Sequence, residues 1–536
     1  MSQPVITQPR KLATPDAILG KLLSLFAPAN RRAAFLSALV GGLLCHLYIL
    51  TNMLPEHDWQ YNFYADQSKV MLGRWLLKWA CAPSSNAILS WFTGLLVLFY
   101  LALAAVLVVD LLDIRSPALA GLAGLLIVTM PSVASGFAYM FTADGYFLSV
   151  LLAVAAARLA CCRRKVPGTL LAALALGCSM GIYQAYAGVT LLLFCSVLIL
   201  RLLRDQPSFR TFFVDALPMI LSVILGVLFY FVMLYLSLAR SGQTLADYQG
   251  ISALGGGSEL SIAVLLNRLY LLFSAWREGA RYLFFEFPAL GNSVWGQRFV
   301  WIMYLLLALL LLGCVWAQRL WRRPWALPVL ALILVLIPLG TNYVEVLTSE
   351  VSSHLLMRYS LTVPFLLVLA LTQLLLDSRD AFLPLRQAAA IAVPLAALGL
   401  CLSWTVLVNA GYTHMEYQYE RVYSNMVRMA DRLQQTEGYY AGIPVMISNS
   451  YAETLIEGDQ IDTSGLTGLG GIVQYDAYHY ISFLRTWCGL DIQGCEPETA
   501  GQIWGTEEFQ DMPAWPESGC TQVIDGVLVV KTAPTE

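Results

Sequence analysis

Long apolar stretches, separated by short polar segments, follow one another along most of this chain. A stretch of about 20 apolar residues is long enough to cross the hydrocarbon core of a bilayer as a helix. Windows of this kind predict eleven membrane-spanning helices, at residues 33–53, 88–109, 117–133, 144–161, 168–182, 185–203, 212–238, 299–317, 325–341, 355–376 and 387–409. Because eleven is odd, we expect the two ends of the chain on opposite sides of the membrane.

The basic residues of the short loops indicate how these helices are oriented. If the spans simply alternate, the basic loops all fall on one side of the membrane, which the positive-inside rule assigns to the cytoplasm. These loops hold Arg31, Arg32, Arg115, Arg163, Arg164, Lys165, Arg204, Arg210, Arg319, Arg322, Arg323, Arg379 and Arg386. The N-terminal segment, residues 1–32, is therefore expected in the cytoplasm, and the end of the chain on the outer side.

Two outer segments are predicted to lie along the membrane surface instead of crossing it. Residues 260–287 form an apolar run that is interrupted by Arg268 and followed by Arg277. Counting this run as a span would place the later basic loops outside. We therefore interpret it as an amphipathic interfacial helix within a large outer loop, residues 239–298. The first outer loop, residues 54–87, has aromatic and charged residues at helical spacings and predicts a second interfacial helix.

The last part of the chain carries more charge, glycine and proline than the rest and contains no predicted span. Apolar periodicity and turn residues predict a helix, a strand and a hairpin in it. These are a helix at 414–436 ended by Gly438, a strand at 443–448, and a hairpin of 521–524 with 527–531 around Asp525-Gly526. Residues 33–409 are thus expected to form the membrane domain, and residues 410–536 a small α/β domain on the outer side.

Composition excludes a soluble fold. Of the 536 residues, 58% are hydrophobic and only 12% are charged, and a soluble protein of this length cannot bury so much apolar surface. The formal net charge of −3 indicates no particular partner, and we expect none among nucleic acids. The sequence has no CxxC, HExxH or Walker motif. Of the outer cysteines, Cys81, Cys488, Cys495 and Cys520, the second and third are a plausible disulfide pair in an oxidising compartment.

Three acids stand at the outer mouths of predicted spans. Glu56 and Asp58 come directly after the first span, and Asp144 opens the fourth. Acidic side chains at membrane depth are costly, so these are candidates for chemistry at the membrane face. The alternative is that they cap helix starts or pair with nearby Lys and Arg. His57, between the first two acids, either satisfies a backbone group of the loop or contacts a substrate.

Several short motifs spread over nearly the whole chain resemble the glucosyltransferase type II family of bacterial membrane proteins. They are Glu56-His-Asp-Trp59, Gly73-Arg-Trp75, Ala143-Asp-Gly145, Gly181-Ile-Tyr-Gln-Ala-Tyr186 and the helix of residues 417–434 before the outer domain. The resemblance implies a GT-C type enzyme of the bacterial inner membrane. Such an enzyme takes a sugar, usually glucose, from a polyprenyl-phosphate carrier. It adds the sugar to a surface polysaccharide or lipid-linked glycan, such as O-antigen, on the periplasmic face.

Sugar transfer with inversion needs a carboxylate that takes the proton of the acceptor hydroxyl. We hypothesise that Asp58 is this general base, and that Glu56 shares the role or positions the acceptor. Asp144 is interpreted as a second acid, a metal ligand or a hydroxyl-binding group. A divalent cation held by Asp58 and Asp144 is optional, because arginine can balance the phosphate charge.

The departing phosphate needs positive groups, and Arg358 is the first candidate. It lies just inside the tenth predicted span, deep enough that a counter-anion is expected. A lipid phosphate would serve, because a guanidinium binds phosphate through two N–H groups. An internal ion pair with Glu345 or Glu350 explains the residue equally well.

Other outer residues are candidate ligands of the substrate. Arg74, Lys69 and Lys78 of the first outer loop are alternative phosphate ligands, although contact with ordinary lipid headgroups would also explain them. Tyr183 and Gln184 interrupt an apolar stretch after the fifth span, where they bind or stack on a sugar or simply form a turn.

A flippase or transporter of lipid-linked sugars is the alternative function. Such proteins also have many spans and intramembrane charges. They usually contain internal repeats or spans broken by Gly and Pro at matching positions, and we find no convincing repeat here. The long outer loops and the outer domain favour an enzyme that works on one face.

Overall fold

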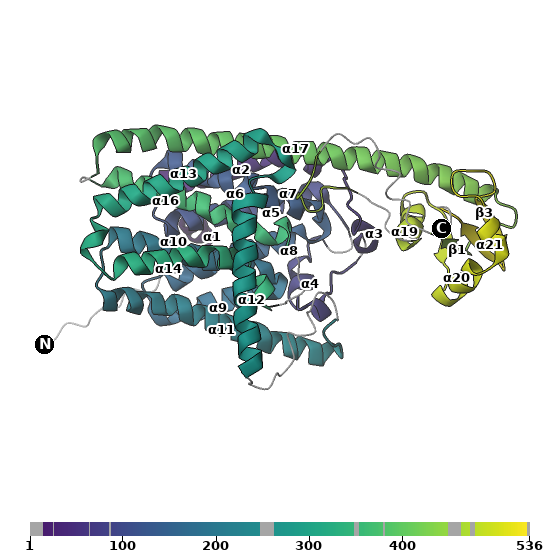
Figure 1. The fold of residues 1–536 in the computed structure, drawn as a ribbon, viewed down its shortest axis with the longest axis horizontal. Helices are drawn as coiled ribbons and strands as arrows, with labels where there is room; N and C mark the ends of the chain where they lie inside the picture. The colour runs from purple at the N-terminus through teal and green to yellow at the C-terminus, as the bar shows by residue number, and fades with distance from the viewer. Residues whose placement is uncertain are drawn as a thin grey trace.

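The protein consists of a bundle of long helices and a small α/β unit, which one long helix joins (Figure 1). The computed structural model describes residues 14–24, 26–63, 65–84, 87–246, 262–347, 353–378, 381–448, 462–471 and 477–532. Glu350, one of the two predicted ion-pair partners of Arg358, lies outside the described residues.

Ten helical segments in the described ranges are long and apolar enough to cross a membrane, so this is a multi-pass membrane protein. They are α2 (Ala29–Thr51), α5 (Ser90–Leu111), α6 with α7 (Pro117–Thr129, Pro131–Ala138), α8 (Met140–Ala160), α9 (Lys165–Ile182), η2 with α10 (Gln184–Tyr186, Ala187–Arg204), α11 (Phe209–Ser241), α13 (Val294–Ala317), η7 with α16 (Leu355–Leu361, Thr362–Asp377) and α17 (Leu383–Gln435). The eleventh predicted span corresponds to α14 (Ala326–Thr341). Its 16 residues make a helix of about 24 Å, shorter than the hydrocarbon core of ~30 Å. An eleventh crossing stays a prediction.

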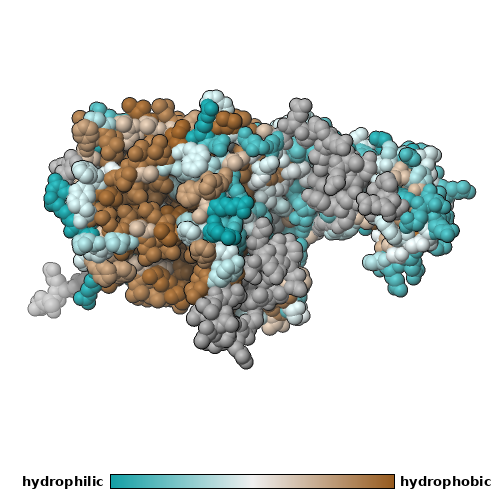
Figure 2. Space-filling model, viewed as in Figure 1, coloured by the Kyte–Doolittle hydropathy of each residue, from teal (hydrophilic) through white to brown (hydrophobic). Residues whose placement is uncertain are grey.

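The helices differ in how much of their surface the bundle covers. The most apolar window of η7 with α16 is 94% buried, whereas the windows of α13 and α11 are 22% and 28% buried. In Figure 2 the bundle presents a broad apolar surface, whereas the α/β unit is mainly hydrophilic. Side chains that are apolar on all sides of a helix fit both a packed interior and lipid, which is why these segments were recognisable from composition alone.

Polar contacts gather the basic loops at one end of the bundle, which we call the basic end. Arg31 at the start of α2 pairs with Asp110 at the end of α5 (2.8 Å), and Arg204 at the end of α10 pairs with Asp113 (2.7 Å). The backbone N–H of Ser116 donates to Gln373 of α16 (2.9 Å). The α/β unit lies beyond the opposite end (Figure 1). Spans that cross the membrane in alternating directions predict this placement of the basic loops at one end and the α/β unit at the other.

Helix α12 (Ile262–Arg281) runs across the direction of the long helices instead of along it (Figure 1). It packs closely on α14, because a Cβ atom on Gly279 would lie 2.2 Å from the carbonyl oxygen of Pro338. Leu269, Tyr270 and Phe273 on α12 are exposed. This geometry agrees with the predicted interfacial helix. The other short elements of the membrane domain are α1 (Pro15–Ser24), η4 (Tyr282–Glu286), η5 (Leu290–Asn292), η6 (Leu320–Arg322) and α15 (Val344–Leu347).

The prediction of one interfacial helix in the first outer loop is wrong. The loop instead forms three short pieces, α3 (Trp59–Asn62), η1 (Val70–Leu72) and α4 (Leu77–Ala80). The backbone has positive φ at Gln67 (57°) and Gly73 (75°), which a continuous right-handed helix excludes. Contacts with the bundle stabilise this path, since the N–H of Leu76 donates to the carbonyl of Gly181 near the end of α9 (2.8 Å).

Helix α17 corrects the predicted boundary between the two domains. It continues without a break for 53 residues, so the last predicted span and the predicted helix at 414–436 are one helix. No proline lies near the predicted boundary, and the side chain of Asn409 bonds within the helix and to Cys45 of α2 (2.9 Å). The end of the helix agrees with the prediction, because Gly438 has φ of 87° two residues after the cap.

The α/β unit contains a mixed four-stranded sheet in the order β2-β1-β4-β3. Strand β1 (Ile443–Ile447) is parallel to β2 (Ile492–Gly494) and to β4 (Val527–Val530), and β3 (Thr521–Ile524) is antiparallel to β4. The predicted strand and hairpin are confirmed. Helix α19 (Ala477–Thr486) packs near the first outer loop, where the rings of Phe63 and Trp487 are 6.0 Å apart. Helices α20 (Pro497–Trp504) and α21 (Glu507–Asp511) complete the unit.

The expected disulfide does not form. All 11 cysteines are free, Cys488 and Cys495 included. Cys488 packs with Val445 of β1 in one apolar cluster, whereas Cys495 packs with Met446 in another. Successive strand residues point to opposite faces of a sheet, so the two thiols lie on different faces.

A test of the bundle is Gly124→Ala in α6. A Cβ atom there would lie 2.4 Å from the carbonyl oxygen of Ala34 and 3.0 Å from the amide of Ala38, both in the backbone of α2. We expect a loss of about 1–3 kcal/mol in the free energy of unfolding, measured in detergent, because backbone cannot move aside cheaply. Gly313→Ala is the matched control, since its Cβ meets only the tip of the Leu385 side chain at 3.0 Å. Equal stability of both variants would contradict this packing.

Candidate active site

The first outer loop places Glu56, His57 and Asp58 as a connected group. The loop is held by Trp59, which is fully buried and whose indole Nε1–H donates to the carbonyl of Ala138 (2.7 Å). Oε2 of Glu56 lies 2.9 Å from Nδ1 of His57, and Oδ1 of Asp58 lies 3.7 Å from Nε2 of the same ring. The backbone N–H of Asp58 donates to Oε1 of Glu56 (2.9 Å). We call these three side chains the carboxylate chain.

Burial changes steadily along the carboxylate chain. The side chain of Glu56 is fully buried, that of His57 is 30% exposed and that of Asp58 is 43% exposed. Burial raises the pKa of Glu56 to about 7, although His57 acts in the opposite direction. Burial lowers the pKa of His57, but the hydrogen bond and charge of Glu56, together with the charge of Asp58, outweigh it and raise that pKa. Asp58 is therefore the carboxylate that a substrate can reach.

Among the described residues, the carboxylate chain places three ligand atoms within 4.8 Å of one another, near enough to hold a cation. Its geometry does not suit one ion. Glu56 faces Nδ1 of the imidazole and Asp58 faces Nε2, and a single ion binds only one of these nitrogens. The arrangement is that of one imidazole ring between two carboxylates.

Asp144 lies in the first turns of α8 and is fully buried. Its Oδ1 accepts from the hydroxyl of Ser84 (2.8 Å) and from the N–H of Gly145 (2.9 Å). Within the described ranges, its Oδ2 is buried without a hydrogen-bond partner. The described group of three possible cation ligands, Glu56, His57 and Asp58, does not include Asp144. Cation binding by Asp58 together with Asp144 stays a prediction.

Arg74 lies against the aromatic side chains of α8 and of the turn after α9. Its Nη1 donates to the hydroxyl of Tyr146 (3.0 Å), and its guanidinium carbon is 4.7 Å from the centre of the Tyr183 ring. These two rings are stacked with centroids 4.5 Å apart. Such contact with aromatic faces holds a guanidinium rigidly while leaving donors at its edge. Tyr146 is not among the predicted site residues, although it lies only two residues after Asp144.

The remaining candidates of this region have other surroundings. The side-chain amide of Gln184 donates to the carbonyl of Leu72 (3.0 Å) and to the hydroxyl of Tyr230 (3.2 Å), so it anchors the first outer loop. Lys78 is half-exposed and pairs with Asp66 (2.5 Å). Lys69 pairs through its backbone with Arg74 in an isolated β-bridge. Among these, Gln184 has a structural role that its turn position alone did not reveal.

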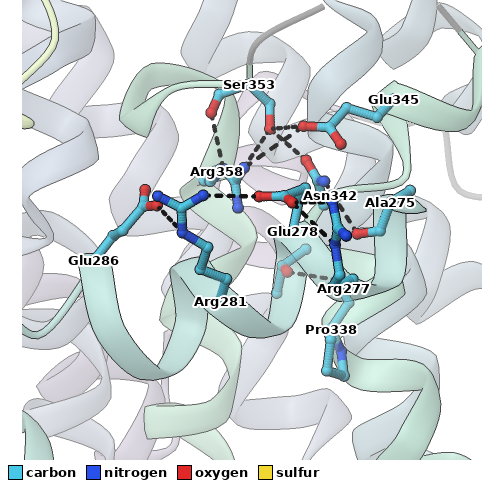
Figure 3. Close-up of polar contacts among 11 residues, drawn as sticks. Ala275, Arg277, Glu278, Arg281, Glu286, Pro338, Asn342, Glu345, Ser353 and Arg358 are labelled. Carbon is cyan, nitrogen blue, oxygen red and sulfur yellow. Dashed lines mark hydrogen bonds and ion pairs between the residues drawn. The ribbon is translucent and has the colours of Figure 1, made fainter. Parts of the chain in front are cut away.

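Arg358 is buried at the start of the α16 segment, with a side chain only 4% exposed (Figure 3). Its Nη2 donates to the hydroxyl of Ser353 (2.5 Å) and lies 3.9 Å from Oε1 of Glu345, and its Nε donates to the carbonyl of Ser353 (3.2 Å). The guanidinium carbon is 3.9 Å from the centre of the Tyr282 ring. In the part of the chain that the structure describes, its Nη1 has no hydrogen-bond partner.

Two residues outside the predicted set connect these groups. The pKa of Tyr139 is raised, first by burial and then by the charges of Glu56 and Asp58, and Tyr146 and Tyr183 add to the effect. The pKa of His354 is lowered to about 4, first by burial and then by the charges of Arg358 and Arg74. Tyr139 thus lies near both the carboxylate chain and the aromatic pair, and His354 lies near both arginines. Their positions in three dimensions, and no sequence motif, reveal them.

All of these groups lie at the same end of the bundle. Helix α2 begins at the basic end and α16 ends there, so Glu56 after α2 and Arg358 before α16 are both at the opposite end. Lys165 at the start of α9 pairs with Asp215 of α11 (2.9 Å) at the basic end, which places Tyr183 at the opposite end as well. One end of the molecule therefore offers an exposed carboxylate, stacked tyrosines, the buried Arg358 and the partly buried Arg74.

Comparison with known proteins identifies the family of the chain. A family model described as glucosyl transferase GtrII matches residues 47–375. Comparisons with curated proteins and with solved structures find no match. The matched segment begins within α2 and ends within α16, so it contains the carboxylate chain and both arginines. Because the match covers more than half of the 536 residues, the chain belongs to the glucosyl transferase GtrII family, and this membership implies that it is a glycosyltransferase.

Proposed function

We propose that the protein transfers glucose from a polyprenyl-phosphate carrier to a surface polysaccharide or lipid-linked glycan, such as O-antigen. In this proposal it is a GT-C type enzyme of the bacterial inner membrane. Residues 1–32 are cytoplasmic, and the α/β unit and the site are periplasmic. Family membership supports the sugar transfer. The gathering of basic loops at the end opposite the site supports the orientation, because basic loops remain in the cytoplasm.

The observation that carries the proposal is the combination of Asp58 and Arg358 at one end of the bundle. Asp58 is an exposed carboxylate, 43% accessible. Arg358 is buried and, among the described residues, keeps one nitrogen without a hydrogen-bond partner. A base for the acceptor and a cation for the departing phosphate are the two groups that an inverting transfer requires.

Asp58 takes the proton from the acceptor hydroxyl as that oxygen attacks the anomeric carbon of the sugar. A glycosidic C–O bond forms while the bond from the anomeric carbon to the phosphate oxygen breaks on the opposite face, so the configuration inverts. The electron pair of the broken bond stays with polyprenyl phosphate. Glu56 is fully buried, so we assign it to holding the loop and His57 instead of contacting the acceptor.

Arg358, Arg74 and His354 receive the phosphate. The ion pair of Arg358 with Glu345 is long, at 3.9 Å, and uses Nη2, so the same guanidinium can hold this ion pair and bind a phosphate through Nη1. Nδ1 of His354 is buried and, within the described chain, lacks a hydrogen-bond partner. A phosphate oxygen would satisfy such groups, because hydrogen bonds to charged partners are the stronger ones.

The other side chains have supporting roles in this proposal. The stacked rings of Tyr146 and Tyr183 are buried and hold the guanidinium of Arg74. Asp144 is fully buried like Glu56, so we assign it to holding the first outer loop through Ser84. Lys69 and Lys78 contact the headgroups of membrane lipids. Because the arginines supply positive charge, this mechanism assigns no step to a divalent cation.

A transfer assay tests the proposal against a flippase. Purified protein in liposomes is given a radiolabelled polyprenyl-phosphate glucose and a crude polysaccharide acceptor. We expect label in the polysaccharide, covalently bound and released only by glycosidic cleavage. Movement of the labelled lipid between leaflets without covalent transfer would contradict the proposal and favour the flippase.

A further inference from the structure

We propose that His57 is a proton relay that connects the exposed carboxylate of Asp58 with the buried carboxylate of Glu56. The inference rests on the proposed function and deepens it, because it assigns the path of the proton that the acceptor loses. It concerns three consecutive residues whose side chains the first outer loop turns toward one another.

The two nitrogens of one imidazole ring face two different carboxylates. Nδ1 is 2.9 Å from Glu56, a hydrogen-bond distance, and Nε2 is 3.7 Å from Asp58. The longer gap closes by a small rotation of Asp58, whose exposed side chain has room to move. Catalytic hydrogen bonds are often longer before substrate binds. A ring with one nitrogen at each carboxylate can accept a proton on one side and release a proton on the other.

The gradient of exposure gives the relay a direction. Asp58 reaches solvent and therefore the acceptor, whereas Glu56 is fully buried. Burial disfavours a charged carboxylate and favours its protonated form. The buried end of the chain is thus the better place to hold a proton during transfer, and the exposed end is the better place to collect one.

The proposed steps balance in protons and electrons. The acceptor O–H bond breaks and an O–H bond forms on Asp58. Asp58 then gives this proton to Nε2 of His57, while the proton on Nδ1 moves to Oε2 of Glu56. Asp58 is left ionised, Glu56 is protonated and the imidazole is neutral in its other tautomer. After the product leaves, the reverse transfers return the proton through Asp58 to water.

Two phenols near the carboxylate chain do not compete for this proton. They are Tyr139, between α7 and α8, and Tyr478 on α19. Burial, and then the charge of Asp58, raises the pKa of Tyr478 to about 12, and the pKa of Tyr139 is also raised. Both phenols therefore stay neutral near pH 7. His479 on α19 is a further neighbour, with its ring centroid 6.1 Å from that of His57.

The relay predicts a pH dependence that Glu56→Gln changes. The relay needs ionised Glu56 and neutral His57, and burial raises the pKa of Glu56 to about 7. The rate of transfer is therefore expected to rise as the pH increases through this value and to level off above it. In Glu56→Gln the rate is lower, because an amide cannot accept the proton, and the rise moves to lower pH, because Glu56 no longer raises the pKa of His57. An unchanged profile in this variant would remove Glu56 from the path.

Chemical rescue tests His57 directly. In full-length His57→Ala we expect the rate to fall at least about 100-fold, the size of a lost proton-transfer group. Added imidazole and its methylated forms should restore activity, and the restored rate should increase with the basicity of the amine. The native ring is 30% exposed, which gives small amines access. If His57 had only a structural role, an added amine could restore activity by filling the space of the missing ring. The restored rate would then not depend on the basicity of the amine.

Matched variants keep the test decisive. His479→Ala removes the neighbouring ring and should gain nothing from imidazole. If His57→Ala does not fold, His57→Gln keeps much of the size and hydrogen bonding, and a normal rate in it overturns the relay. Rescue that is independent of basicity also overturns it. Normal activity of Asp58→Asn would reject the proposed function. If Asp58→Asn is inactive while His57→Ala is fully active, only the relay is rejected.

Discussion

Asp58→Asn is expected to lower the rate of sugar transfer by about 10²–10⁴-fold, the usual contribution of a general base, while the protein stays in the membrane. Asparagine keeps the size and the hydrogen bonding of the side chain but cannot take up the proton of the acceptor. The measurement is transfer of labelled sugar by purified variant at saturating donor. The amount of variant protein in the membrane and its thermal unfolding are measured on the same preparation.

Asp66→Asn is the matched control for this variant. Asp66 lies in the same outer loop, and its side chain is 47% exposed, close to the 43% of Asp58. It pairs with Lys78 at the surface, and an exposed pair contributes only about 0–1 kcal/mol to stability. We therefore expect nearly normal transfer. Near-normal activity of Asp58→Asn would remove this carboxylate from the mechanism, whatever the control shows.

The helical bundle was predictable because lipid imposes a simple requirement on each span. A helix such as α5 must be apolar over its whole length to cross a bilayer, and that pattern is visible in a window of about 20 residues. The positive-inside rule added a second requirement, that the basic loops lie on one side of the membrane. The ion pair of Arg31 with Asp110 lies at the end of the bundle where these loops gather. Even α12 could be recognised as an exception from its interrupted apolar run.

The first outer loop and the domain boundary were not predictable, because tertiary contacts determine both. The path of residues 54–87 depends on the bond from Leu76 to Gly181 and on Trp59 reaching Ala138, partners that lie far away in sequence. Composition changes near residue 409, yet α17 continues, since a helix can pass from lipid to water when its side chains change. Strand β2 has three residues, too few for an alternating pattern.

The candidate site was predictable in its residue types but not in its distances. The cost of acids at membrane depth identified Glu56, Asp58 and Asp144 as unusual. Only the fold shows that Asp144 bonds to Ser84, and that His57 lies between the other two acids. The partners that complete the site, such as Tyr139 and His354, come from segments that no motif connects. Candidate chemistry is therefore visible in sequence, whereas the division of roles requires the structure.

Arg358→Ala is expected to raise the KM for the lipid-linked donor by about 10- to 100-fold. A hydrogen bond to a charged group contributes about 1.5–3 kcal/mol, and each 1.4 kcal/mol corresponds to about a factor of ten in affinity. Arg358→Lys should recover only part of this, because an ammonium lacks the planar pair of donors that matches a phosphate. The measurement is the rate at varied donor concentration, with KM for the acceptor as an internal reference.

Glu345→Gln separates the two explanations of Arg358. If the arginine serves only to pair with Glu345, removing either partner leaves an uncompensated buried charge, and both variants should lose stability by about 3–5 kcal/mol. If the arginine binds phosphate, Glu345→Gln removes a competing anion that lies 3.9 Å away, and the affinity for the donor should stay the same or increase. Ser353 still bonds to the guanidinium in that variant and keeps it in place. If Arg358→Ala and Glu345→Gln are destabilised alike, and the folded protein of each has a normal KM for the donor, Arg358 serves the ion pair. The departing phosphate is then bound by Arg74.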